Sequence, residues 1–245
     1  PFDEQAVQEL LDIGVERFKI SGFESTDLRF VEMVASSKLP LIISMGIGSR
    51  SLDFFSLYRV TQKYGNEITL LHCNNAYPTP IEDIRLGMLR EIMDKVKKYP
   101  RINNVGLSDH TMSVRTPSLA VAMGASVIEK HFTLDRNLDG PDHPFALEPQ
   151  ELKEMISLIR ETEVMVKNDD SLYTESEKNF IYARRSVVTK APIKTGDVLT
   201  RKNITTKRPF VEGAVPASDF DQLLGQKMYQ DLNEDEIIKY SMVNR

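Results

Sequence analysis

The stretch Ile68–Lys98, ITLLHCNNAYPTPIEDIRLGMLREIMDKVKK, contains one complete unit of the pattern that decides the fold. It begins with an apolar run that ends at His72, passes through a polar turn, and continues with helical periodicity over Ile81–Lys98. Pro80 lies near the start of that segment, where a helix tolerates proline well. Because a continuous apolar run is typical of a parallel strand covered on both faces, the stretch predicts a buried β-strand followed by an amphipathic helix.

The same unit recurs through about the first 165 residues. The other short β-rich runs are Phe18–Ile20, Leu41–Ser44, Asn104–Leu107 and Ser126–Glu129. Helical segments lie between them, which predicts βαβ units and a parallel sheet. Polar residues crowd after the runs, as they do at the mouth of a (β/α)8 TIM barrel, and the sequence lacks the G-x-G-x-x-G loop that a doubly wound sheet normally carries. We therefore expect an α/β fold of the TIM-barrel type.

The expected barrel is incomplete. The sequence contains five predicted strands, whereas a closed barrel of this kind has eight. The chain also opens on a predicted helix, Phe2–Leu11, without a strand before it. About three βα units, roughly 100 residues, would have to precede this sequence or be supplied by another chain.

Composition predicts two domains joined by a linker. Residues 1–166 form the partial barrel, whose last helix is expected over Pro149–Val166. Residues 167–182 are polar and are expected to form the linker. Residues 183–245 show short strands and turns, which predict a compact, β-rich domain that is small for independent stability.

The composition also excludes several classes of protein. No run of apolar residues reaches the roughly 20 that a membrane-spanning helix needs. The single cysteine, Cys73, excludes a disulfide framework and suits a reducing compartment. A net charge of -5 argues against nucleic-acid binding, which needs a basic surplus to neutralise phosphates. We expect a globular, cytoplasmic protein that acts on small molecules.

Two histidines end consecutive predicted strands, His110 and His131. Neighbouring strand ends in a barrel lie close together, so the two imidazoles could share one divalent ion such as Mn²⁺, Fe²⁺ or Zn²⁺. Each could equally be a hydrogen-bonded histidine of the barrel wall. His72 and His143 are weaker candidates, since each could be structural or simply exposed.

Charged residues near the strand ends point to an anionic ligand. Lys19 lies within an apolar strand, where an ammonium group needs a partner. That partner could be a phosphate or carboxylate ligand, or the nearby Glu24. Glu129 should share a face with His131, where it could orient the imidazole, contact substrate or form a core ion pair. These residues indicate a metal-dependent barrel enzyme with an anionic substrate.

Several sequence motifs together resemble those of the sialic acid synthase family, whose enzymes make nine-carbon keto sugars from phosphoenolpyruvate. The most specific is Ile128–His143, IEKHFTLDRNLDGPDH. The phrases that accompany it are Tyr77–Pro80 (YPTP), Gly106–Thr111 (GLSDHT), Ala183–Ser186 (ARRS) and Lys207–Pro209 (KRP). They occur in the family's order and span essentially the whole chain.

The resemblance implies a fold, a reaction and partners. The fold would be a (β/α)8 barrel followed by a small antifreeze-like (SAF) domain, in a homodimer whose SAF domain covers the partner's site. The enzyme would condense phosphoenolpyruvate with an N-acyl mannosamine-type sugar and release phosphate. A divalent metal, usually Mn²⁺, would assist.

The resemblance also implies roles for individual residues. The metal ligands would be His110 and His131. Phosphoenolpyruvate would be held by Lys19, Ser44, Asn75 and Ser108. The acceptor sugar would be held by Glu24, Tyr77 and Asp142, together with Arg208 from the partner's SAF domain. The carboxylates expected to act as acid, base or orienting groups are Glu24 and Glu129.

Some residues depart from the family pattern. Gly22 stands where family members usually have serine, Met45 stands where threonine is usual, and Phe210 follows the KRP phrase in place of a Gly-rich turn. The Phe23-Glu24 pair resembles the pseudaminic and legionaminic acid branches. Two alternatives stay open: a metal-dependent pyruvate aldolase on the same barrel, and a non-catalytic or truncated homologue that only binds sugar.

Overall fold

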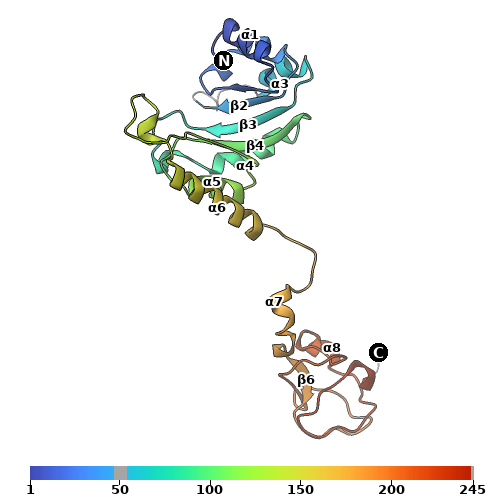
Figure 1. Ribbon diagram of the computed structural model, residues 1–245. Coiled ribbons are helices and arrows are strands. Elements are labelled where there is room, and N and C mark those ends of the chain that lie inside the picture. Colours follow the sequence, from blue (N-terminus) through green and yellow to red (C-terminus); the bar gives the residue numbers. More distant parts are fainter. Residues whose placement is uncertain (47–53, 244–245) are drawn as a thin grey trace. The chain divides into compact units, whose positions relative to one another are not determined.

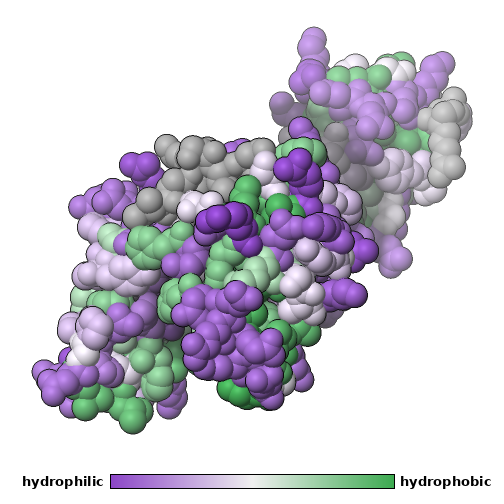
Figure 2. Space-filling model, turned by 90° about the horizontal axis from the view of Figure 1, so that it is seen from above, coloured by the Kyte–Doolittle hydropathy of each residue, from purple (hydrophilic) through white to green (hydrophobic). Residues whose placement is uncertain are grey.

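The computed structural model describes residues 1–46 and 54–243. Contacts within the chain divide it into two compact units, Pro1–Asn168 and Asp169–Arg245, and each is described by itself. Over the face seen in Figure 2, hydrophilic and apolar residues are intermixed in small patches.

The first unit is built on a parallel sheet of five strands (Figure 1). The strands are β1 (Phe18–Ile20), β2 (Leu41–Met45), β3 (Ile68–Cys73), β4 (Ile102–Asp109) and β5 (Val127–Lys130). Each strand pairs with the next one along the chain, so the order never reverses. A doubly wound sheet would reverse its order at a switch point, so the prediction of a barrel-type sheet is confirmed.

Helices alternate with these strands. They are α1 (Glu4–Ile13), α2 (Leu28–Ala35), α3 (Phe54–Gln62), α4 (Gly87–Val96), α5 (Thr116–Ala122) and α6 (Pro149–Met165). The single helix expected over Ile81–Lys98 is wrong in its first part, where Ile81–Asp83 is a 3₁₀ turn and α4 begins only at Gly87. The break coincides with Arg85, whose positive φ of 47° cannot continue a right-handed helix. No helix among the described residues is both long and apolar enough to cross a membrane.

The two faces of the sheet have different chemistry because successive side chains of a strand point to opposite sides. One face packs on the helices and forms the core, with Ile20, Ile43, Leu70 and Leu107 fully buried there. The other face carries Lys19, Ser44, Ser108 and Glu129, all close to the carboxyl ends of their strands. The alternation therefore separates the core from a polar surface at one end of the sheet.

The second unit has a core of its own. Its strands β6 (Ser186–Thr189) and β7 (Ile204–Lys207) pair antiparallel, and the short helix α8 covers Phe220–Leu223. Val187, Ile193 and Ile238 are among the side chains that fill this core. The segment expected as a linker contains a short helix, α7 (Glu175–Lys178), and a 3₁₀ turn at Ile181–Ala183.

Gly106 is required where β4 meets β5. A Cβ atom at this position would lie 2.1 Å from the carbonyl oxygen of Val127, a backbone atom that cannot rotate away. We expect Gly106→Ala to lower the free energy of unfolding by about 1–3 kcal/mol, as overpacking does, in urea denaturation followed by circular dichroism. Gly87→Ala is the control, since a Cβ there meets nothing within 4 Å. Equal stability of the two variants would contradict this account.

Asp231 stabilises the second unit through its charged form. Its Oδ1 accepts hydrogen bonds from the backbone N–H and the hydroxyl of Thr195 (2.8 and 3.0 Å), and Oδ2 lies 2.9 Å from Lys194 Nζ. These donors, the Thr195 N–H first, lower the pKa of Asp231 from 3.8 to about 2. The stabilisation is therefore complete above pH 3.8 and is lost as the pH falls through about 2. A carboxyl titration by NMR should show that midpoint, and a value near 3.8 would refute the network.

Candidate active site

The edge strands β1 and β5 contribute an ion pair to the polar face of the sheet. Lys19 Nζ lies 3.1 Å from Glu129 Oε2. Ser108 Oγ, from β4, donates a 2.6 Å hydrogen bond to the other carboxylate oxygen of Glu129. Glu24, the alternative partner considered for Lys19, instead accepts a hydrogen bond from Ser21. Both carboxylate oxygens of Glu129 are thus held, one by Lys19 from the opposite edge strand and one by Ser108 from the adjacent strand β4.

His110 and His131 lie directly after β4 and β5, with their ring centroids 5.2 Å apart. The Nδ1 atom of His110 is 2.7 Å from the Asn74 carbonyl oxygen. A carbonyl only accepts, so Nδ1 carries the proton and Nε2 keeps its lone pair. Burial lowers the pKa of His110, which favours this neutral form.

The two imidazoles fit a divalent metal as a partial ligand set. Asp142 Oδ2 lies 3.6 Å from His131 Nδ1, which is longer than a hydrogen bond, whereas His110 Nδ1 is hydrogen-bonded to an oxygen at 2.7 Å. An oxygen partner at the second ring nitrogen is the usual support of a metal-binding histidine. Within the part of the chain that the structure describes, no group of three or more His, Cys, Asp or Glu side chains could hold an ion. Further ligands would have to be water or substrate oxygens.

Tyr77 forms an aromatic wall beside the histidines. Its ring centroid lies 4.2 Å from that of His110, 5.8 Å from that of His131 and 5.6 Å from that of Phe145. The peptide bond to Pro78 is cis, and the side chain is 44% exposed. A partly exposed ring at this place can contact a ligand and limit its access to the histidine pair.

Asn75 is enclosed by two glycines. A Cβ atom on Gly22 would lie 2.8 Å from Asn75 Oδ1, and one on Gly46 would lie only 1.6 Å from it. The Asn75 side chain therefore occupies space that larger residues at these positions would fill. At Gly22 the nearest atom is the end of the Asn75 side chain, so a larger residue there would require the Asn75 amide to shift.

Ser44 and Cys73 lie buried close to this cluster. Ser44 Oγ has no conventional hydrogen-bond partner within residues 1–46 and 54–243. Burial raises the pKa of the Cys73 thiol, while Ser108, Lys19 and Ser44 act in the opposite direction. Cys73 Sγ is 3.9 Å from His110 Nδ1. Sequence reasoning missed this position of the thiol, because cysteine composition says nothing about neighbours.

The remaining candidates are two histidines of the first unit and one arginine of the second. His72 faces the helices, where Nε2 lies 2.6 Å from the Ile84 carbonyl oxygen, and His143 Nδ1 lies 2.7 Å from Thr133 Oγ1. Both weaker histidines thus have structural partners. Arg208 belongs to the second unit, where it is exposed just after β7.

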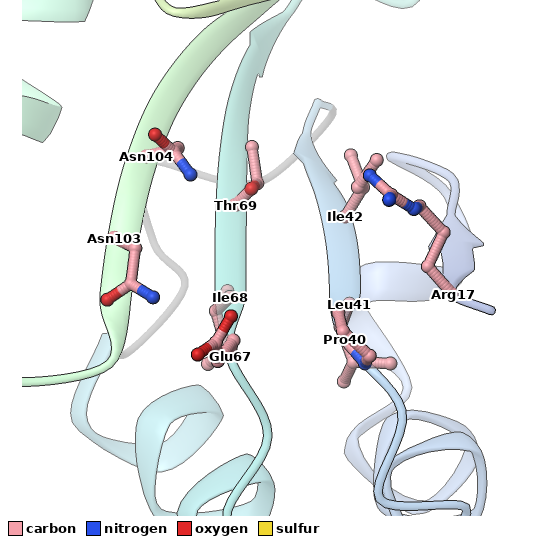
Figure 3. Close-up of a pocket in the computed structure, with 9 residues that line it drawn as sticks. All are labelled: Arg17, Pro40, Leu41, Ile42, Glu67, Ile68, Thr69, Asn103 and Asn104. Atoms are coloured by element: carbon pink, nitrogen blue, oxygen red, sulfur yellow. The ribbon is translucent and has the colours of Figure 1, made fainter.

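A separate pocket of about 150 Å³ lies at the amino ends of the strands (Figure 3). Arg17, Glu67, Thr69 and Asn104 are among the residues that line it. None of the residues predicted for catalysis or binding is part of its lining. The candidate chemistry is confined to the carboxyl ends, as in TIM-barrel enzymes.

Comparisons with known proteins agree with this architecture. An N,N'-diacetyllegionaminic acid synthase of Campylobacter jejuni (serotype O:2) is 37% identical over 243 residues, which cover 98% of this chain and 70% of that protein. A pseudaminic acid synthase of Campylobacter jejuni (serotype O:23/36) is 32% identical over 98% of this chain and 68% of its own length. The crystal structure of a putative spore coat polysaccharide biosynthesis protein E of Chromobacterium violaceum has a TM-score of 0.81 at 25% identity, over 100% of this chain and 72% of that one.

Family models match both units of the chain. Residues 184–244 match the SAF domain, which confirms the expected antifreeze-like domain. Residues 1–171 match the NeuB family, so the resemblance to sialic acid synthases is confirmed, and this chain belongs to the NeuB family.

Proposed function

We propose that this chain is a phosphoenolpyruvate-dependent nonulosonic acid synthase, or the carboxyl-terminal two-thirds of one. Membership of the NeuB family and relatives that are named as legionaminic and pseudaminic acid synthases support the reaction class. The observation that carries the proposal is the set of contacts in which Glu129 pairs with Lys19 and accepts a hydrogen bond from Ser108. It places a cation, a carboxylate and a hydroxyl together at the strand ends, beside two histidines.

The chemistry joins two substrates and removes phosphate. Carbon 3 of phosphoenolpyruvate attacks the aldehyde carbon of an open-chain acylated amino sugar, which forms the new C–C bond. Water adds at carbon 2, and the C–O bond to phosphate then breaks. The products are a nine-carbon 2-keto acid and inorganic phosphate.

Lys19, Ser44, Asn75 and Ser108 would bind phosphoenolpyruvate. Glu129 is the ion-pair partner of Lys19 within the chain. An incoming phosphate or carboxylate would compete for the ammonium group and release one oxygen of Glu129. That oxygen could then hold a proton or orient water, the role proposed for this carboxylate. Ser44 Oγ, which has no conventional partner in the described residues, could donate to a substrate oxygen.

His110 and His131 would hold a divalent metal, for which Mn²⁺ is our proposal. When bound, the ion would act as a Lewis acid toward the sugar aldehyde. The protein's own contribution is to orient the His110 ring through its bond to the Asn74 carbonyl, while burial favours the neutral form of His110. Neutral imidazole is the form that binds metal ions.

The acceptor sugar would lie against the Tyr77 ring, with Glu24 and Asp142 as hydrogen-bonding groups. Arg208 would reach this site from the SAF domain of a second copy, in a homodimer whose SAF domain restricts water. A cytoplasmic location is part of the same proposal, since phosphoenolpyruvate is an intracellular metabolite.

The two alternatives are less well supported. Relatives that are named as synthases favour phosphate release over the chemistry of a pyruvate aldolase. The missing strands and the departures at Gly22, Met45 and Phe210 favour a non-catalytic homologue, whereas retention of both histidines and of the whole Ile128–His143 motif opposes it. Release of phosphate with phosphoenolpyruvate, and no product with pyruvate, would separate the synthase from both alternatives.

The metal site is tested by His110→Ala/His131→Ala in the full chain. We expect the Mn²⁺ affinity, measured by electron paramagnetic resonance of the free ion, to fall by roughly 100-fold or more. Loss of a residue that only supports a metal ligand can already lower affinity by about that much. Mn²⁺-dependent phosphate release should disappear with it. His143→Gln is the matched control and should keep the parent Mn²⁺ affinity, because His143 contacts Thr133. Unchanged affinity in the double variant would refute the ligand assignment.

The role of Glu129 is tested by Glu129→Gln, which still accepts from Ser108 but cannot exchange a proton. We expect kcat to fall about 100-fold or more, with a smaller change in KM for phosphoenolpyruvate. Lys19→Met should show the opposite pattern, a raised KM, because it removes the cation that would bind substrate. If Glu129→Gln raises KM and leaves kcat intact, Glu129 serves only to position Lys19.

A further inference from the structure

A buried ion pair lies on the helix-facing side of the sheet, directly behind the two histidines. Asp109 and Lys130 are register partners on β4 and β5, and each one immediately precedes a histidine, His110 or His131. Lys130 Nζ lies 2.7 Å from Asp109 Oδ2, and the two side chains are 5% and 0% exposed. The pair therefore ties together the two strand ends from which the histidines project.

Thr111 extends this network beyond His110. Its backbone N–H donates a 2.9 Å hydrogen bond to Asp109 Oδ1, and its carbonyl oxygen accepts a hydrogen bond from Lys130 Nζ. The residues on both sides of His110 are thus held by one ion pair. The carbonyl of His110 itself accepts from the Thr79 N–H at 2.9 Å. The backbone at His110 is fixed from three directions.

Stability alone is a poor explanation for such a pair. Both charged side chains are almost fully buried, so the ammonium and carboxylate groups lose their hydration at this site. Apolar residues of similar volume often replace buried ion pairs without loss of stability. What they cannot replace is a directed hydrogen bond to the Thr111 carbonyl and another from the Thr111 N–H.

We propose that Asp109 and Lys130 are positioning residues for the histidine pair, and that they hold the His110 ring in the orientation that leaves Nε2 free for a metal ion. The metal part of this inference rests on the proposed function. The positioning part concerns the chain's own residues: without the network, the turn at residues 109–111 loses its anchor, and the His110 ring loses its fixed bond to the Asn74 carbonyl.

The test is Asp109→Leu/Lys130→Met in the full chain, which keeps the buried volume and removes the hydrogen bonds. We expect a thermal midpoint close to that of the parent. Mn²⁺ affinity should be about 10- to 100-fold weaker, the usual effect of losing a supporting shell. In the absence of metal, imidazole ¹⁵N NMR should show loss of the single Nδ1–H tautomer of His110. If the pair served only to stabilise the fold, a variant with the parent thermal midpoint would keep both the parent Mn²⁺ affinity and the Nδ1–H signal of His110.

A second variant separates hydrogen bonding from charge. Asp109→Asn/Lys130→Gln is neutral, but its amides can still accept from the Thr111 N–H and donate to the Thr111 carbonyl. We expect it to restore the His110 tautomer and most of the Mn²⁺ affinity, and it also serves if the apolar pair fails to fold. Glu32→Gln/Lys63→Met is the control, since that 2.5 Å pair joins α2 to the end of α3, away from the histidines.

The outcomes distinguish the two proposals. A folded apolar variant with the parent Mn²⁺ affinity and an intact Nδ1–H signal would overturn the positioning role. If His110→Ala/His131→Ala leaves Mn²⁺ binding unchanged, the metal site of the proposed function fails. The ¹⁵N signal of His110 would then still decide whether Asp109 and Lys130 position the ring.

Discussion

The contact between Lys19 and Glu129 shows how strongly the sheet of the first unit must curve, because it joins the two edge strands. Neighbouring strands lie about 4.8 Å apart, so in a flat sheet β1 and β5 would be separated by about 19 Å. A lysine and a glutamate side chain cannot bridge that distance. The 3.1 Å ion pair therefore requires a strongly curved sheet, in which the carboxyl ends of five strands converge. The same curvature gathers Ser108 and the two histidines around one space.

Curvature also explains why small and polar residues occur where they do. Close approach of β4 and β5 leaves no room for a side chain at Gly106, and the Asn75 side chain needs Gly22 and Gly46 beside it. On the outer face, the apolar core supports the strands, and the Asp109–Lys130 pair locks the last two of them together. The concave face is then free to carry the charges and hydroxyls of the candidate site.

Much of this architecture follows from local patterns. Continuous apolar runs identified all five strands, and the phrases around His110 and His131 identified the family. Sequence patterns did not predict features that depend on contacts between residues far apart in the chain or on the backbone conformation of a single residue. Glu24 was considered as the protein partner of Lys19, whereas that partner is Glu129 on β5. The helix expected from Ile81 is interrupted at Arg85, whose backbone conformation no periodicity reveals.

The hydrophobic periodicity of the sequence was sufficient to count the strands of the parallel sheet, since each apolar run depends only on residues close together in the chain. Which groups meet was decided only by the tertiary structure. Lys19 and Glu129 are brought together by the closing curve of the sheet, and Asp109 and Lys130 by the register of β4 and β5. The interaction energy of each ion pair depends on the distance between the two charges and on their burial. Both quantities are set only when the strands pack into the sheet.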